Sequence, residues 1–219
     1  MPASRSKIRP GGLVKGTVIA AIVAAFAVGT WPLYNQIVTA RIAAAAKRVV
    51  AGEDLTEVRR WEALCLGVCP VTALVAGGSA RAALASRSKS AERVEALDQA
   101  ETLLVAATKT QPLNGEAWIQ LAYVRGLQDL GPSPRMQATL LRSYEVQPFS
   151  QQGGMWRIRL CGGYWPLVSE KLHAAAIEEA RWRWSIHADE RPLILAALPN
   201  PEARQALEAR IAATPLRPY

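Results

Sequence analysis

The hydrophobic pattern divides the chain into an uncharged N-terminal run and a longer body with helical periodicity. Residues 16–40 carry no charged side chain and are dominated by Val, Ile, Ala and Phe. A helix of about 20 apolar residues spans the hydrocarbon core of a bilayer, which is about 30 Å thick. Trp31 and Tyr34 fall where an aromatic belt would meet the membrane interface. The run therefore predicts a transmembrane helix over residues 16–40, in which Pro32 marks either the helix end or a kink.

Charges on either side of this run predict its orientation. Four cations precede it without an acid among them (Arg5, Lys7, Arg9 and Lys15), and three cations follow it before the first acids. The positive-inside rule places residues 1–15 in the cytoplasm and the rest of the chain across the membrane. Two alternatives stay open: a cleaved signal peptide ending at the small-x-small motif of residues 25–27, and a buried helix of a soluble protein.

Residues 41–90 predict a helical stalk followed by an apolar linker. The stalk is rich in Ala and breaks near Gly52. Residues 63–78 are uncharged but contain Pro70 and are too short for a comfortable span, so we expect buried core or a membrane-surface element. A second span is the alternative, and it would return the body to the cytoplasm. Residues 79–90 are expected to form a polar, Ser-rich connection.

Cys65 and Cys69 stand four residues apart and would share one face of a helix. A regular helix offers poor disulfide geometry at this spacing. A redox or metal site would use the CxxC spacing or further ligands, and no His lies near. We expect small apolar core residues, with a disulfide and a metal or redox site as alternatives. Cys161 stands alone and is expected to be a buried small hydrophobe.

Apolar residues recur at helical spacing through residues 91–190. Turn residues, such as those of Gly131-Pro132-Ser133-Pro134, separate stretches of about 14 residues, a length and spacing typical of antiparallel helix pairs. Residues 191–219 predict a C-terminal helix, capped by Asn200 and followed by a short tail. The body is therefore expected to be all-α.

A repeat family shares part of this spacing. Seven residues keep the positions of a second helix and of the next first helix of a tetratricopeptide repeat: Ala100, Leu104, Ala107, Pro112, Trp118, Leu121 and Ala122. Two weaker units follow, up to residue 185, and residues 131–134 lengthen the 34-residue period. The stretch resembles a degenerate tetratricopeptide array; the alternative is a helical bundle with chance spacings.

The resemblance implies a fold and a binding surface. The fold is an N-terminal transmembrane helix followed by a degenerate tetratricopeptide-like helical-hairpin array. Stacked hairpins of this kind form a concave surface that binds proteins. Gln120, Tyr123 and Leu127 are the candidate partner-binding residues on that surface, and Tyr123 is the best single candidate, because a rigid amphipathic ring binds at low entropic cost.

Charge and motif content bear on chemistry. The formal net charge is +8, but residues 1–61 hold nine basic and three acidic side chains, so the body is nearly neutral and a nucleic-acid partner is not expected. Nucleophile, phosphate-loop and dinucleotide motifs are missing from the sequence. His173 and His187 stand far from any Cys, and Glu170 with His173 lacks the second such pair that carboxylate metal sites need. We expect no catalytic residue, cofactor or metal, and no enzymatic activity.

These observations predict a bacterial inner-membrane protein with one span and a periplasmic body that binds other envelope proteins. Its arrangement resembles that of accessory proteins of surface-polysaccharide synthesis and export. The alternatives are a membrane-protein biogenesis or transport factor with a cytoplasmic body, and an enzyme with an unrecognised site.

Overall fold

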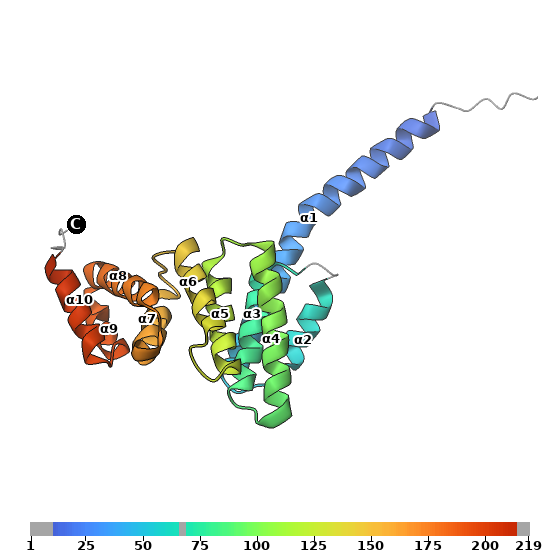
Figure 1. Ribbon diagram of the computed structural model, residues 1–219. Helices are drawn as coiled ribbons and strands as arrows, with labels where there is room; N and C mark the ends of the chain where they lie inside the picture. The colour runs from blue at the N-terminus through green and yellow to red at the C-terminus, as the bar shows by residue number, and fades with distance from the viewer. Residues whose placement is uncertain (1–10, 66–68, 214–219) are drawn as a thin grey trace, which may run out of the picture.

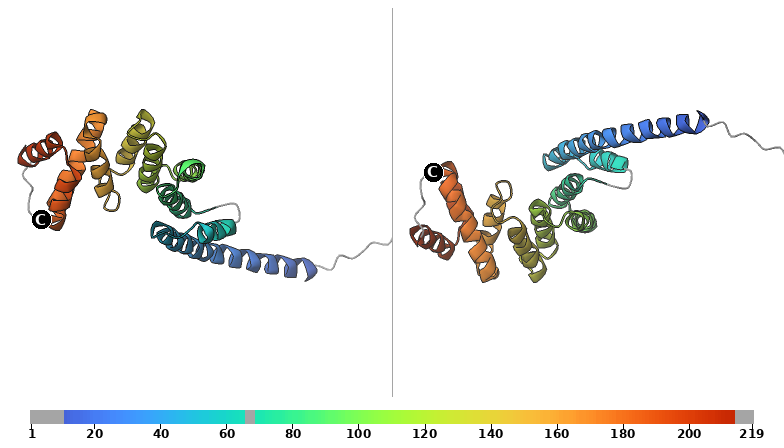
Figure 2. Two further views of the ribbon diagram at one scale, coloured as in Figure 1. Left: turned by 90° about the horizontal axis from the view of Figure 1, so that it is seen from below. Right: turned by 90° about the horizontal axis from the view of Figure 1, so that it is seen from above.

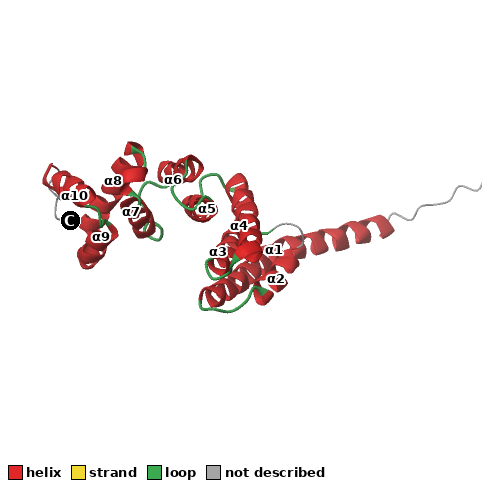
Figure 3. Ribbon diagram, turned by 60° about the horizontal axis from the view of Figure 1, so that its bottom comes forward, coloured by secondary structure: helices red, strands yellow, loops and turns green. Residues whose placement is uncertain are grey.

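The computed structural model describes the backbone of residues 11–65 and 69–213, and the side chains from Gly29 onward within those ranges except that of Ser90. These residues form ten α-helices and three short 3-10 helices, and no strand is found among them (Figure 3). The predicted all-α class is confirmed. The tail beyond residue 213 and the first ten residues of the predicted cytoplasmic N-terminus lie outside the described residues.

Helix α1 (Gly11–Val50) is 40 residues long, and its N-terminal half projects away from the rest of the molecule (Figure 1). The helix continues through Pro32 and does not end there. Its C-terminal half packs on the body through buried side chains such as Val38 and Ile42. The predicted break is confirmed: α1 ends at Val50, and Gly52 has a φ of +120°, a conformation that favours glycine.

The transmembrane prediction concerns a part of α1 that is only partly described. Among the side chains that the structure describes, no helix is long and apolar enough to cross a membrane. The side chains of residues 16–28, which make up half of the predicted span, lie outside that part of the structure. The span therefore stays a prediction.

The region predicted as stalk and linker folds onto the body. Helix α2 (Thr56–Glu62) and the 3-10 helix η1 (Ala63–Cys65) run back along α1, and α3 (Val71–Ala85) packs against both α1 and α4. Val71, Ala73, Gly77 and Gly78 are buried, so the part of the uncharged stretch in α3 contributes to the core, whereas Leu64 in η1 is exposed.

The polar connection predicted over residues 79–90 is wrong for residues 79–85, which continue α3. Small side chains allow this, because Ala80, Ala82 and Ala85 are buried against neighbouring helices. Arg81 is also buried, and it donates to both carboxylate oxygens of Glu62. The boundary predicted at residue 90 therefore falls within a helical hairpin.

Six helices form three consecutive hairpins, and two further helices follow the third hairpin (Figures 1 and 2). The hairpins are α3 with α4 (Ser90–Thr110), α5 (Gly115–Gln128) with α6 (Pro134–Val146), and α7 (Gly154–Gly163) with α8 (Glu170–Ile186). Helix α9 (Arg191–Ala197) then packs on α7, and α10 (Pro201–Ala213) packs on α8. The C-terminal region thus holds two helices where the sequence predicts one.

Side-chain caps fix where several helices start. The Asn114 side chain accepts from the backbone N–H of Ala117 at 3.1 Å, and Ser133 accepts from Met136 at 3.2 Å. Asn200 accepts from Glu202 at 2.8 Å, which confirms the predicted cap of the last helix. Each cap satisfies a backbone donor that has no partner within the helix.

Glycines let the helices approach closely at two joints. A Cβ on Gly78 of α3 would lie 2.7 Å from Cγ of Leu104 on α4, and a Cβ on Gly162 of α7 would collide with the carbonyl oxygen of Ala197 on α9. Both glycines are buried. Helix pairs at this separation leave no room for a side chain, so these positions favour glycine for reasons of space rather than of conformation.

Cys65 and Cys69 form a disulfide with their Cα atoms 4.8 Å apart. The expectation of two apolar core thiols is therefore corrected in favour of one of its alternatives. The physical reason is that the two residues do not share a regular helix, because η1 ends at Cys65 and Cys69 precedes Pro70 outside any helix. Cys161 is a free, buried thiol, as predicted.

Candidate functional site

The three predicted partner-binding residues lie on one face of α5, and all three are half-buried. Gln120 Nε2 donates to Oε1 of Glu116 at 2.8 Å. The Tyr123 ring meets the Trp156 ring of α7 edge-to-face, with centroids 5.5 Å apart. Tyr123 and Leu127 also pack against the core cluster shared by α3, α4 and α5. The face therefore contributes to the joint between hairpins as well as to the surface.

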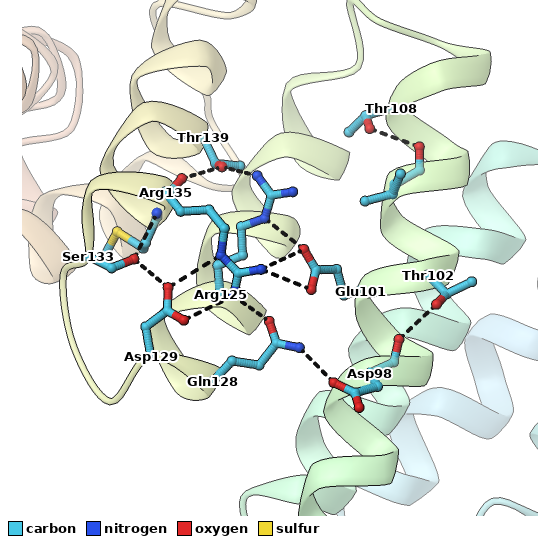
Figure 4. Close-up of polar contacts among 12 residues, drawn as sticks. Asp98, Glu101, Thr102, Thr108, Arg125, Gln128, Asp129, Ser133, Arg135 and Thr139 are labelled. Atoms are coloured by element: carbon cyan, nitrogen blue, oxygen red, sulfur yellow. Dashed lines mark hydrogen bonds and ion pairs between the residues drawn. The ribbon is translucent and has the colours of Figure 1, made fainter.

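A polar cluster connects α4, α5 and α6 (Figure 4). Glu101 on α4 accepts from Nε of Arg125 on α5 at 2.9 Å and from Nη1 of Arg135 on α6 at 3.3 Å. Arg135 also donates to Asp129 at 3.0 Å through Nη2, and Arg125 donates to the hydroxyl of Thr139 at 2.6 Å. The figure shows both guanidinium groups pointing toward Glu101. The cluster thus holds three helices in register.

Electrostatic shifts in this cluster follow from its hydrogen bonds. The Ser133 hydroxyl donates to Asp129 and holds the pKa of that carboxyl below its usual range, with help from Arg135. In turn, Asp129 raises the pKa of Arg135. Both effects favour the charged forms, so Asp129 and Arg135 stay ionised at neutral pH. An open groove of about 550 Å³ runs beside it along α4, lined by Asp98, Glu101, Thr102, Val105, Ala106 and Lys109.

A second, largely apolar groove of about 670 Å³ lies between α8 and α10. It is lined by Trp165, Glu170, His173, Ala174, Ile177, Glu178, Ala206, Ala209, Arg210 and Ala213. The His173 ring stacks on the Trp165 ring at 3.9 Å, and its Nε2 lies 2.7 Å from the Trp165 carbonyl oxygen, to which it donates. His173 is therefore held in place by its neighbour.

Metal-ligating side chains do not converge among the described residues, where no group of three or more His, Cys, Asp or Glu is found. Glu170 and His173 line the same groove, as their spacing on one helix face requires, but no further ligand joins them. His187 lies at the C-terminal end of α8.

The most deeply buried charges lie where α6, α7 and α8 meet. Arg157 of α7 is fully buried, and its Nε donates to Oε2 of Glu179 on α8 at 2.9 Å. Its Nη1 donates to the carbonyl oxygens of Ser143 at 3.0 Å and Gln147 at 2.9 Å, at the end of α6. The guanidinium also lies over the Tyr144 ring, 4.1 Å from its centroid. One side chain thus joins three helices.

Burial shifts the titration of the groups around Arg157. It raises the pKa of Glu179, an effect that the hydrogen bonds and charge of Arg157 oppose. It also raises the pKa of the Cys161 thiol to about 12. A thiol with such a pKa stays protonated at neutral pH, and the thiolate is the nucleophilic form. Cys161 and its neighbours therefore have the chemistry of a structural core.

Sequence reasoning missed the buried network and the groove between α8 and α10, and it gave the disulfide only as an alternative. A signal for the network was present: Arg157 stands four residues before Cys161, so a charge falls within the apolar face of a predicted helix. Such a charge needs a buried partner.

No family model matches the chain, and no curated protein or solved structure is significantly similar to it.

Proposed function

We propose that this protein is a membrane-anchored scaffold whose stacked helical hairpins bind partner proteins in the bacterial cell envelope. The observation that carries the proposal is the architecture: a long apolar helix leads into a series of hairpins whose outer surfaces stay accessible (Figure 1). Surface-polysaccharide synthesis or export is the process that the resemblance of the sequence favours.

The length of the projecting part of α1 supports an anchor. Tyr34 contacts the body, because its hydroxyl donates to the carbonyl oxygen of Leu64. Residues 16–33 precede that contact, and at about 1.5 Å per residue they extend for about 27 Å. This length is close to the thickness of about 30 Å of a hydrocarbon core. The helix would thus cross the bilayer and leave the body at its surface.

The disulfide supports a body outside the cytoplasm. Disulfides form and persist in oxidising compartments such as the bacterial periplasm and are rare in the cytosol. The Cys65–Cys69 pair lies in the body, beyond the predicted span. It therefore agrees with the charge bias that places residues 1–15 in the cytoplasm, and it weighs against the alternative of a cytoplasmic body.

Packing within the hairpins supports tetratricopeptide-like units. Gly78 of α3 packs against Leu104 of α4, and Ala122 of α5 shares a core cluster with Leu140 of α6. In both of these hairpins a small residue on the first helix thus accompanies a large one on the second. On this basis the partner-binding face is that of Gln120, Tyr123 and Leu127, centred on the half-exposed aromatic pair of Tyr123 and Trp156.

Site-specific photo-crosslinking in cells tests partner binding without breaking the Tyr123 contact. A benzophenone amino acid at position 120 or 127 is expected to give discrete protein adducts. The control is position 138, where Ala138 is exposed on α6. Equal adducts from all three positions, or none from positions 120 and 127, would contradict the proposed face.

Paired lysines test the anchor. Val23→Lys with Ala27→Lys places two charges near mid-bilayer, each of which costs roughly 3 kcal/mol on insertion scales, and should release the chain from carbonate-washed membranes. Gln36→Lys with Ala40→Lys has the same spacing on exposed positions and should not. Retention of the first variant in the membrane pellet would show that α1 is not the anchor.

A further inference from the structure

Four large apolar side chains are exposed where α1 leaves the body. Trp31 is 44% exposed, Leu33 59%, Ile37 47% and Leu64 42%. Three of them lie on α1, within two turns of one another, and the fourth lies on η1. We name these four residues the apolar edge.

Leu64 is held at this edge by contacts with α1. Tyr34 of α1 donates to the Leu64 carbonyl oxygen, and Cys65 packs in a cluster with Val38 and Ile42. The disulfide to Cys69 closes the segment that follows. In Figures 1 and 2, α2 runs alongside α1, and its C-terminal end points toward the projecting half of α1. The exposed Leu64 follows α2 in η1 and so lies near the end of α2 that points toward the predicted anchor.

Cations surround the apolar edge on the side of the body. The Arg41 guanidinium lies over the Trp61 ring, 5.6 Å from its centroid, and Arg59 and Arg60 are exposed on α2. The carboxylate on this part of α2, Glu62, is bound by Arg81 at 2.6 and 2.7 Å. Glu57, one turn earlier, lies 3.4 Å from Arg60. Asp54 lies close enough to Arg59 for that cation to lower its pKa, so the three arginines face two carboxylates and the region keeps a small positive excess.

We propose that Leu64 and these three arginines form a second contact with the membrane, beside the three residues of the apolar edge that belong to the predicted span, at the surface of a bilayer that contains anionic phospholipid. The proposal rests on the proposed function, which supplies the anchor. Apolar and aromatic side chains suit the boundary between headgroups and acyl chains. Arginines just outside that boundary are attracted to anionic headgroups within a Debye length of the surface.

This contact has a consequence for the scaffold. A single helix leaves the body free to turn about the helix axis, whereas a second contact at Leu64 fixes which side of the array faces the bilayer. The partner-binding face would then be presented in one orientation. A disulfide that holds η1 in place serves this arrangement directly.

Photo-crosslinking to lipid in nanodiscs tests the contact in the full chain. The benzophenone amino acid replaces Leu64, Val94 or Phe26 in separate samples. Position 94 is the control. Val71 at the start of α3 packs against Ala107 near the end of α4, so the exposed Val94, near the start of α4, lies at the other end of the α3/α4 hairpin from Val71. We expect lipid adducts from positions 26 and 64 and none from position 94.

The lipid composition tests the arginines. Adducts at position 64 should increase when phosphatidylglycerol is added to phosphatidylcholine discs. Replacing Arg41, Arg59 and Arg60 together by Gln should abolish this increase and leave adducts at position 26 unchanged. Adducts at position 26 without any at position 64 would overturn the surface contact and leave the anchor standing. If neither position gives adducts, both proposals fail.

Discussion

Two Arg–Glu pairs join helices at opposite ends of the array, and they differ in depth. Arg81 of α3 binds Glu62 of α2 and lies 3.2 Å from Gln99 of α4, and the two charged side chains are 9% and 18% exposed. Arg157 of α7 binds Glu179 of α8, and both of these side chains are fully buried. Each pair connects three helices, because Arg157 also reaches the backbone of α6. An Arg–Glu ion pair thus connects the helices at both joints, but water can reach the Arg81–Glu62 pair and cannot reach the Arg157–Glu179 pair.

The depth of burial determines how much stability is lost when one member of an ion pair is removed. A carboxylate left without its cation near the surface can be hydrated, whereas one left in a dry interior keeps the full desolvation penalty. Arg157 also satisfies carbonyl oxygens at the end of α6, which would lose their partner with it. The C-terminal joint should therefore depend far more on its ion pair than the N-terminal joint does.

The largest effect is expected from Arg157→Met. The change removes the ion-pair partner of the buried Glu179, to which the Ser150 backbone N–H still donates, and should destabilise the protein by about 3–5 kcal/mol. The matched variant Arg81→Met should cost about 1–3 kcal/mol, because hydrogen bonds to charged groups near the surface are worth roughly that much. Urea unfolding of both variants in the same detergent measures the difference. Equal losses would contradict the role of depth.

Two glycine contacts, one near each end of the array, should also differ, and the C-terminal contact should again be the more costly to disturb. A Cβ on Gly162 meets the backbone of α9, which cannot move aside, whereas a Cβ on Gly78 meets only the Leu104 side chain. Gly162→Ala should cost about 3 kcal/mol, at the upper end of overpacking effects, and Gly78→Ala less. The control is Gly163→Ala, where a Cβ has nothing within 4 Å. Melting temperatures that fall equally for positions 162 and 163 would count against the packing of α7 on α9.

Replacing both cysteines measures how much the disulfide contributes to stability, and we expect a smaller loss than for Arg157→Met or Gly162→Ala. Cys65→Ser with Cys69→Ser releases a loop of only a few residues, and loop-closure entropy predicts a loss of about 2 kcal/mol. The loss should vanish when the unchanged chain is measured under reducing conditions, since both samples then lack the cross-link. If the melting temperature of the unchanged chain is the same with and without reductant, the disulfide is not formed.

The smallest effect is expected at the solvent-exposed polar cluster. The folded-state pKa of Asp129 is lowered, so its stabilising contribution is present above the unfolded pKa of about 3.9 and is lost as the pH falls through the folded pKa. Asp129→Asn should therefore lower the melting temperature slightly at pH 7 and by less at an acid pH below the folded pKa, where the native carboxyl is protonated. The same difference at both pH values would exclude a role for the charge.

Most helices of the body could be predicted from the sequence, because their apolar stripes follow a 3.6-residue period and their ends carry Asn, Gly and Pro. Helix α3 was not predicted, because its first half was expected to be buried core or a membrane-surface element and its second half a polar connection. Its Gly77-Gly78 pair and its Ser and Arg residues are typical of a connection, and their burial depends on Leu104 and Glu62, which come from other helices. Small residues at a close helix contact leave no periodic signal.

For the candidate site, the placement of its residues on one helix face could be predicted from the sequence, but their contact with the next hairpin could not. The sequence placed Gln120, Tyr123 and Leu127 on one helix face, because spacing within a helix is a local property. The contact between Tyr123 and Trp156 depends on how two hairpins stack, and no local pattern encodes that. The same holds for the disulfide, which required knowing that η1 ends at Cys65.

The most direct test of an anchored array with its body outside the cytoplasm is a thiol count on carbonate-washed membranes. The chain is denatured without reductant and labelled with a maleimide mass tag. With Cys65 and Cys69 joined in the periplasm, the membrane pellet should contain the chain with one tag, on Cys161, and with three after reduction. Three tags without reductant, or a chain in the supernatant, would contradict the proposed anchor and compartment.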